Sequence, residues 1–133
     1  MTVFIDSNIP MYVAGREHPF KEPSIAFLRK VAVGDIAAVS DVEVLQEILY
    51  RYYHTNEIQQ GFQVFEVFLR TIPHIHPVYL DDLLDAKQLL ANHPGIQPRD
   101  AIHAAVMLRI GVKTIVSYDR HFDDLESINR LEP

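Results

Sequence analysis

Cysteine is absent from this chain of 133 residues. The chain therefore forms no disulfide and offers no thiolate ligand to a metal, a composition that fits a reducing cytoplasm. No apolar run approaches the roughly 18 residues that a membrane span needs, and no basic segment precedes the short apolar run at the start. We expect a soluble, cytoplasmic protein with neither a secretory signal nor a membrane anchor.

Positive charge is also scarce: 12 lysines and arginines stand against 18 aspartates and glutamates, which gives a formal net charge of −6. This balance argues against a protein that holds nucleic acid on a broad basic surface. It does not exclude a nuclease whose carboxylates hold cations, because bound metal ions reverse the local charge. The length fits one domain over residues 1–133, since single domains commonly have about 100–150 residues.

Strand patterns alternate with helix patterns along the whole chain. Such alternation predicts an α/β fold with a largely parallel sheet, in which ligands gather at the carboxyl ends of the strands. Ser40, with Glu43 three residues later, has the pattern of a capping box and predicts a helix that begins at Asp41. Apolar spacing and turn residues predict strands at 2–5, 36–39, 75–80 and 114–117, and helices at 23–33, 41–54, 57–70, 82–91 and 99–110.

Three aspartates occupy positions at which a structural role and a functional role both make sense. Asp6 and Asp119 each follow a predicted strand, where an aspartate often makes a local turn bond. Asp100 lies in the first turn of its helix, where the helix dipole favours a carboxylate by about 0.3–1 kcal/mol. The alanines that follow Asp100 allow this helix to pack closely against the sheet, which would turn Asp100 toward the strand ends.

Glu43 and Glu47 share one face of the helix at 41–54. The capping box already gives Glu43 a structural role, so Glu47 is the preferred candidate for a site. A surface ion pair between Glu47 and Arg51 is the alternative, and such a pair contributes about 0.2–0.5 kcal/mol.

Together, the four carboxylates would repel one another at one end of the sheet unless a positive charge lay among them. A hard divalent cation such as Mg²⁺ or Mn²⁺ prefers oxygen ligands and accepts phosphate oxygens as further ligands. Two such ions can activate water and stabilise the leaving oxygen of a phosphodiester. The residues therefore predict a metal site made of Asp6, Glu47, Asp100 and Asp119.

Four segments in this order resemble the PIN-domain family, most closely its stand-alone ribonucleases of VapC type, the toxins of toxin–antitoxin pairs. The resemblance spans nearly the whole chain. The segments are Val3-Phe4-Ile5-Asp6-Ser7-Asn8, Glu47 within residues 44–49, Arg99-Asp100-Ala101-Ile102-His103-Ala104-Ala105, and Ser117-Tyr118-Asp119-Arg120-His121-Phe122-Asp123.

The resemblance implies a PIN-like three-layer α/β/α fold and hydrolysis of RNA phosphodiester bonds by a metal-activated water. It assigns catalysis and metal binding to Asp6, Glu47, Asp100 and Asp119, with Asn8 and Ser117 as the polar residues that orient them. It also implies a homodimer and a small antitoxin that covers the active-site groove. Asp123 could be an accessory carboxylate or a cap of the C-terminal segment, and it stays outside the core set.

Two other functions remain open from the sequence. A receiver-like signalling module would accept phosphate on an aspartate beside Mg²⁺, but Asp6 stands alone after the first strand and Lys113 precedes the last one. An inactive PIN scaffold that only binds RNA or protein is the second.

Other polar side chains have weaker claims to a site. His74 and His76 lack a recognisable third zinc ligand. His103 could bond a neighbouring carboxylate, although helix packing is the favoured role. Four arginines could contact phosphate, although a solvated or salt-bridged side chain is the ordinary role of each. They are Arg16, Arg51, Arg99 and Arg120.

Overall fold

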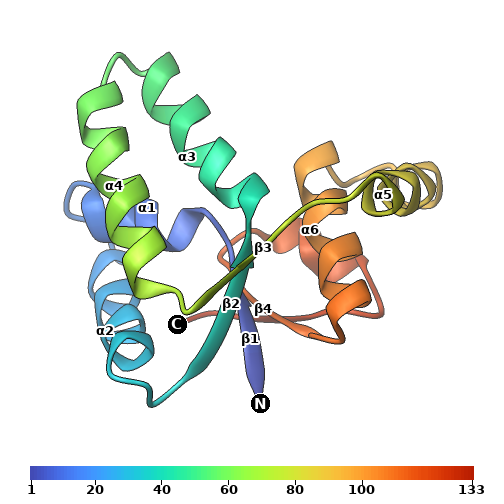
Figure 1. The fold of residues 1–133 in the computed structure, drawn as a ribbon, viewed down its shortest axis with the longest axis horizontal. Coiled ribbons are helices and arrows are strands. Elements are labelled where there is room, and N and C mark those ends of the chain that lie inside the picture. The colour runs from blue at the N-terminus through green and yellow to red at the C-terminus, as the bar shows by residue number, and fades with distance from the viewer.

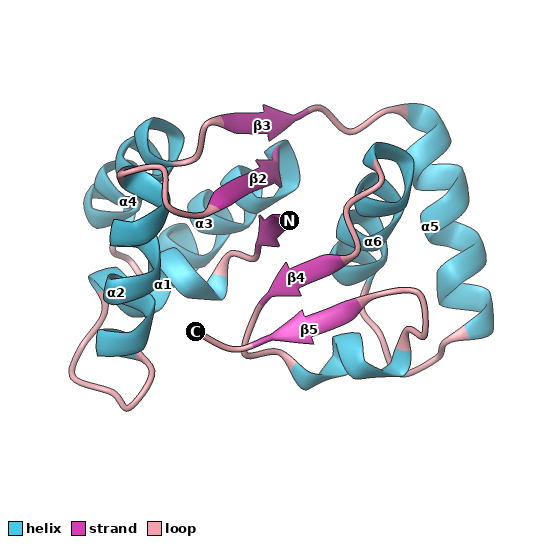
Figure 2. Cartoon of the chain, turned by 90° about the horizontal axis from the view of Figure 1, so that it is seen from below, coloured by secondary structure: helices cyan, strands magenta, loops and turns pink.

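The computed structural model describes all residues, 1–133. Its centre is a parallel sheet of five strands in the order β3-β2-β1-β4-β5 (Figure 2). The strands are β1 (Thr2–Ile5), β2 (Ala37–Asp41), β3 (His74–His76), β4 (Thr114–Val116) and β5 (Asn129–Leu131). The α/β class and the largely parallel sheet predicted from the sequence are confirmed.

Helices cover both faces of this sheet (Figure 1). One side carries α1 (Asn8–Ala14), α2 (Lys21–Ala32), α3 (Val42–His54) and α4 (Ile58–Thr71), and the other carries α5 (Leu80–Asn92) and α6 (Pro98–Ile110). A short 3₁₀ helix, η1 (Arg120–Asp124), follows β4. The chain is thus the three-layer α/β/α structure that the resemblance implied.

β1 lies in the middle of the sheet and is buried on both faces. Val3, Phe4 and Ile5 are at most 2% exposed, because helices cover both sides. Phe4 is aligned with Val39 of β2 and with Ile115 of β4. A continuous apolar run is what a parallel strand covered on both faces requires. This central position puts the residue after β1, Asp6, in the middle of the carboxyl edge.

α6 packs as closely against the sheet as its alanines predicted. Ala101, Ala104 and Ala105 are at most 1% exposed. Pro98 occupies the first turn of the helix, and Gly111, in the left-handed conformation with φ 75°, ends it. A proline at the start and a glycine just past the end are favoured because each suits the backbone there. The first turn of α6, including Asp100, is therefore held against the carboxyl edge.

Several predicted boundaries were wrong. The helix α1 was not predicted, because Asn8 and Pro10 have the composition of a turn; proline is nevertheless tolerated in a first helical turn, whose N–H groups lack partners. β5 was not predicted either. β3 ends at His76 rather than continuing to Leu80, since Pro77 offers no N–H to the ladder. No helix in the structure combines the length and the apolar character needed to cross a membrane.

Candidate active site

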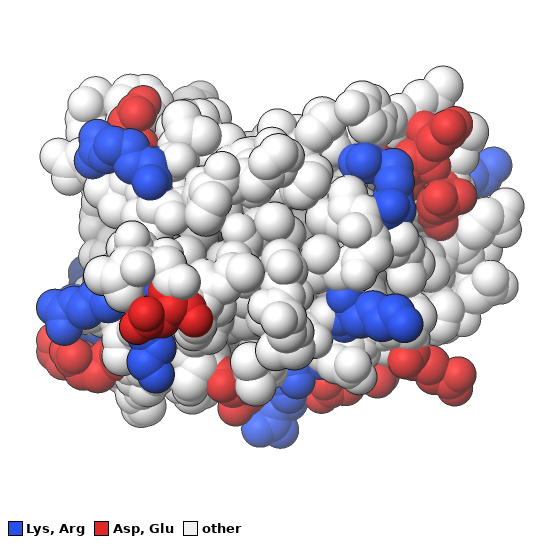
Figure 3. Space-filling model, turned by 60° about the horizontal axis from the view of Figure 1, so that its bottom comes forward, with Lys and Arg blue, Asp and Glu red and all other residues white.

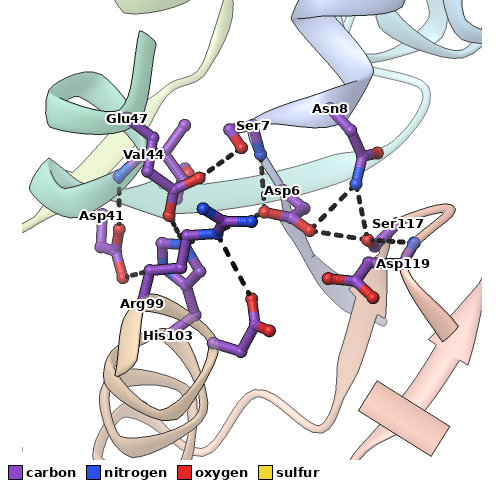
Figure 4. A network of polar contacts seen from close by, with 12 residues as sticks. Asp6, Ser7, Asn8, Asp41, Val44, Glu47, Arg99, His103, Ser117 and Asp119 are labelled. Carbon is purple, nitrogen blue, oxygen red and sulfur yellow. Dashed lines mark hydrogen bonds and ion pairs between the residues drawn. The ribbon is translucent and has the colours of Figure 1, made fainter. Parts of the chain in front are cut away.

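Four elements deliver the predicted carboxylates to the carboxyl edge of the sheet (Figure 4). Two of the carboxylates come from the residues that follow β1 and β4, and two come from helices. They are Asp6 after β1, Glu47 in α3, Asp100 in the first turn of α6 and Asp119 directly before η1. Apart from Asp119 they are nearly inaccessible, with exposures of 4% for Asp6, 9% for Glu47 and 2% for Asp100.

Asp6 is fixed by hydrogen bonds to both carboxylate oxygens. Ser7 donates its backbone N–H to Oδ1 at 2.7 Å, while Ser117 Oγ at 2.6 Å and Asn8 Nδ2 at 3.1 Å donate to Oδ2. Burial raises the pKa of Asp6, and the nearby charge of Glu47 raises it further, whereas His103 and the serine hydrogen bonds counteract the increase. The carboxylate is therefore held in one orientation within a site that favours a compensating positive charge.

Asn8 and Ser117 connect Asp6 to the loop after β4. Asn8 Nδ2 donates to Ser117 Oγ at 2.9 Å, and Asn8 Oδ1 accepts from the backbone N–H of Tyr118 at 3.3 Å. Ser117 Oγ also accepts from the backbone N–H of Asp119 at 3.0 Å. Ser117 therefore bonds both Asp6 and the backbone of Asp119, and Asn8 bonds both Asp6 and Ser117.

Glu47 is held by a buried histidine. His103 Nε2 lies 2.6 Å from Glu47 Oε1, and His103 Nδ1 lies 2.9 Å from Asp41 Oδ2. Burial alone would lower the pKa of His103, but the charge of Asp41 and the hydrogen bonds to both carboxylates outweigh it and raise the pKa well above its usual value. The imidazolium then donates from both nitrogens. Ser7 Oγ donates to the other oxygen of Glu47.

Asp100 is the least satisfied of the four carboxylates. Its Oδ2 is buried and has no hydrogen-bond partner. The guanidinium of Arg99, on a half-exposed side chain, reaches only to 4.0 Å from Oδ1. Burial, followed by repulsion from Asp119 and Asp6, raises the pKa of Asp100 from 3.8 to about 6. A buried carboxylate oxygen without a partner destabilises the folded protein, and a bound cation would remove this cost.

The four carboxylates form two groups of potential metal ligands. Asp6 and Glu47 group with His103, and Asp100 and Asp119 group with His121; within each group the ligand atoms lie within 4.8 Å of one another. His103 already uses both ring nitrogens on carboxylates, so oxygen ligands dominate. His121 Nδ1 lies 3.0 Å from Asp119 Oδ1. Oxygen donors with one unsatisfied buried member fit Mg²⁺ or Mn²⁺.

The predicted capping box at the start of α3 was wrong. Asp41 is the N-cap, and its Oδ1 accepts from the backbone N–H of Val44 at 3.0 Å. Ser40 remains in β2 and donates its Oγ to the carbonyl of Ile5 at 2.8 Å. Glu43 is therefore not part of a capping box, and Glu47 is the glutamate that joins the cluster.

Sequence reasoning missed the roles of Asp41 and Ser7, and it favoured helix packing for His103. His103 does pack on Phe4, with ring centroids 5.4 Å apart, but its two carboxylate bonds are its main contacts. The available signal was that Asp41 lies just past the predicted strand at 36–39, since a similar place after a strand singled out Asp6.

The remaining predicted candidates lie outside the cluster. Asp123 pairs with Arg130, whose Nε is 2.9 Å from Oδ1. The rings of His74 and His76 are 4.3 Å apart, and neither belongs to a group of three potential metal ligands.

Comparisons with known proteins show the family of the chain. The family model of the PIN domain matches residues 3–127. The chain is 33% identical to Ribonuclease VapC13 of Mycobacterium tuberculosis over 129 residues, which cover 97% of this chain and 98% of that protein. It is 32% identical to Ribonuclease VapC23 of the same species over 117 residues, which cover 88% and 92%.

Solved structures show the same fold. Mycobacterium tuberculosis VapC20, described as a sarcin-ricin loop cleaving toxin, superposes with a TM-score of 0.80 at 16% identity, over 98% of this chain and 99% of that chain. The match to VapBC2 from Rickettsia felis has a TM-score of 0.76 at 17% identity, over 99% and 98%. These matches displace the receiver-like alternative. The family model covers residues 3–127, and a relative that is 33% identical covers nearly the whole chain. The chain therefore belongs to the PIN-domain family and, within it, to the VapC proteins.

Proposed function

We propose that this chain is a Mg²⁺- or Mn²⁺-dependent endoribonuclease, the toxin of a toxin–antitoxin pair. One observation carries the proposal: a buried carboxylate oxygen of Asp100 without a partner lies among three more carboxylates, in a VapC family member. The unsatisfied oxygen supports a cation in the site, and the ribonuclease relatives support RNA as the substrate.

Asp6, Glu47, Asp100 and Asp119 would hold the metal. When bound, a divalent cation supplies a Lewis acid that activates water and stabilises charge on the phosphate. The carboxylates position ions and do not attack the phosphate themselves. All four come from elements that meet at the carboxyl edge of the sheet, so a phosphodiester would approach the site from this edge.

Neighbouring side chains hold these carboxylates in place. Ser117 and Asn8 hold one oxygen of Asp6, and His103, backed by Asp41, holds one oxygen of Glu47. A ligand fixed by such contacts loses little conformational freedom on binding, and removing comparable contacts in other metal sites costs about 10–100-fold in affinity or activity.

The test is metal-dependent cleavage of a panel of single-stranded RNAs by the wild type and by Asp6→Asn and Asp100→Asn. Each variant removes one charge with almost no change in shape. We expect cleavage that requires Mg²⁺ or Mn²⁺ and is lost in both variants. Asp85→Asn, an exposed aspartate of α5, is the control for loss of charge and should cleave like the wild type. Unchanged cleavage by folded Asp100→Asn would refute the mechanism, and a wild type that only binds RNA would support an inactive scaffold.

Two protein partners belong to the same proposal. Membership of the VapC family supports a small antitoxin, and the Rickettsia felis neighbour is VapBC2 bound to a DNA fragment from its promoter. A second copy of the chain is supported by the side chains of Leu80, Leu83 and Leu84 on α5, which are 72%, 46% and 53% exposed. Light scattering of the purified chain tests the dimer, and Leu84→Glu should yield a monomer. Cytoplasmic location is part of the proposal as well, and fractionation of cells tests it.

A further inference from the structure

A pocket of about 630 Å³ lies beside the carboxylate cluster, between α1, the segment that joins α1 to α2, and the C-terminal half of α3. Asn8 lines this pocket and also bonds Asp6 and Ser117. Asn8 therefore joins the pocket to the carboxylate cluster. Its volume is in the range of about 300–1,000 Å³ that is usual for small-ligand sites, which is enough for one nucleotide.

Two arginines of this pocket have no partner in the protein. Arg16 and Arg51 both line it, and neither side chain makes a hydrogen bond or an ion pair. The alternative pairing of Arg51 with Glu47 is absent, because Glu47 is held by Ser7 and His103. A free guanidinium beside a phosphodiesterase site matches the geometry of a phosphate, to which it can donate two parallel hydrogen bonds.

Aromatic rings form another part of the same wall. Tyr12 and His18 line the pocket, with ring centroids 4.8 Å apart. Tyr12 also packs edge-on against Phe20 at 5.4 Å and against Tyr118 at 5.5 Å, so its ring is held from several sides. Single-stranded nucleic acids stack their bases on aromatic rings in positively charged grooves, and a fixed ring in a pocket with unpaired arginines offers this combination.

The segment that carries Arg16 is anchored at its start. Gln60 Nε2 donates to the carbonyl of Ala14 at 3.0 Å, and Lys21 Nζ donates to the carbonyl of Gly15 at 2.6 Å. These bonds reduce the conformational freedom that ligand binding would otherwise have to remove.

The charge of the pocket is mixed, which narrows the kind of ligand. Glu17 and Glu57 line it as well as the two arginines, so a simple anion is not its best match. A nucleotide carries both a phosphate for the guanidinium groups and base N–H groups that carboxylates accept. On the face seen in Figure 3, lysines and arginines are scattered among acidic side chains, so that face presents no continuous basic surface for RNA.

We propose that this pocket binds a nucleotide of the RNA substrate next to the phosphodiester that is cleaved. Arg16 and Arg51 contact its phosphate, and Tyr12 with His18 stacks on its base. This inference rests on the proposed ribonuclease function and names the part of the chain that holds the substrate beside the metal site. The ligand is single-stranded, because a base must leave its duplex to stack on a protein ring.

The experiment compares Arg16→Gln/Arg51→Gln with the matched double variant Arg29→Gln/Arg70→Gln. The control removes the same charge from exposed, unpaired arginines in the last turns of α2 and α4. Binding of a fluorescein-labelled 20-nucleotide RNA is measured by anisotropy with EDTA present, and cleavage of the same RNA with Mg²⁺ or Mn²⁺. We expect the pocket variant to lose at least tenfold in RNA affinity and to raise KM similarly, with a much smaller change in kcat. The control should change either quantity less than twofold.

Shortened RNAs separate a neighbouring nucleotide from general attraction. Removing the nucleotide that fills the pocket, from one side of the cleaved bond, should raise KM for the wild type and leave it unchanged for the pocket variant. Equal losses in both proteins, or equal binding by the pocket variant and its control, would overturn the pocket while the ribonuclease function stands. A wild type that cleaves no RNA with either metal overturns the function and the pocket together.

Discussion

Replacing Asp100 with asparagine should stabilise the metal-free protein. Asp100 is 2% exposed, its Oδ2 has no partner, and burial with repulsion from Asp119 and Asp6 raises its pKa from 3.8 to about 6. A difference of about 2 pH units between folded and unfolded chains corresponds to about 3 kcal/mol, at about 1.4 kcal/mol per unit. Because the amide must also be buried, we expect the variant to gain about 1–3 kcal/mol.

The sign of the pH dependence follows from the raised pKa of Asp100. Between pH 3.8 and about 6 the folded chain keeps a proton on Asp100 that the unfolded chain has lost. The free energy of unfolding therefore falls as the pH rises through this window, and the penalty is complete above it. The variant has no such group, so its advantage should be largest near neutral pH and should shrink in acid.

Urea denaturation in EDTA, followed by circular dichroism at pH values from about 8 down to about 4, measures this effect. Asp85→Asn, at an exposed position, is the control and should change the free energy of unfolding by less than about 0.5 kcal/mol. Added Mg²⁺ should stabilise the wild type more than Asp100→Asn, because the variant has lost a ligand. An Asp100→Asn protein that is no more stable than the wild type at about pH 8 would refute the assignment of Asp100 as a repelled, unsatisfied carboxylate.

Three further substitutions test other parts of the structure. A Cβ at Gly61 would lie 2.6 Å from Tyr52 Cβ. Gly61→Ala should therefore lower the free energy of unfolding, measured in urea, by about 1–3 kcal/mol, although alanine ordinarily favours a helix. An unchanged free energy of unfolding would contradict this close packing of α3 and α4. Arg109→Met removes hydrogen bonds of 2.8 and 3.1 Å to buried Asp82 and should cost about 1–3 kcal/mol at neutral pH. Burial raises the pKa of Asp82, but the hydrogen bond and charge of Arg109 lower it overall. The difference in free energy of unfolding between the wild type and Arg109→Met should therefore narrow as acid protonates Asp82 below pH 3.8. A difference that does not change with pH would count against the ion pair. Ser117→Ala removes a 2.6 Å hydrogen bond to the carboxylate after β1 and should weaken Mg²⁺ binding about 10–100-fold by calorimetry, whereas unchanged affinity would show that this bond does not position the ligand.

Local pattern was enough to place the strands that carry the site. Thr2–Ile5 and Thr114–Val116 are short apolar runs followed by polar residues, and the structure has both as central strands. Asp6 and Asp119 could be placed from this pattern because the carboxyl ends of parallel strands share one edge. α1 and β5 could not be placed from local pattern. Pro10 gives α1 the composition of a turn, and β5 has only three residues and is a strand because it pairs with β4.

Some features of the candidate site could be predicted from the sequence, and others depend on the fold. The types and order of its residues were visible in the sequence, and they predicted oxygen ligands for a divalent cation. The pairing of His103 with Asp41 and Glu47 was not, because these residues are 62 and 56 positions apart and meet only when α6 packs over the end of β2. The unpaired state of Arg51 was also invisible, since helical spacing offered it a partner that the fold directs elsewhere.

The sequence by itself determined the class of fold, the acidic edge and the family, because these depend on residue type, periodicity and order along the chain. The tertiary structure alone decided which carboxylates are satisfied. Asp41, Asp6 and Glu47 receive hydrogen bonds from distant segments, and Asp100 keeps an oxygen without a partner. That difference arises from burial and packing, which set the cost of each charge, and it supports the proposal that the acidic edge binds a cation.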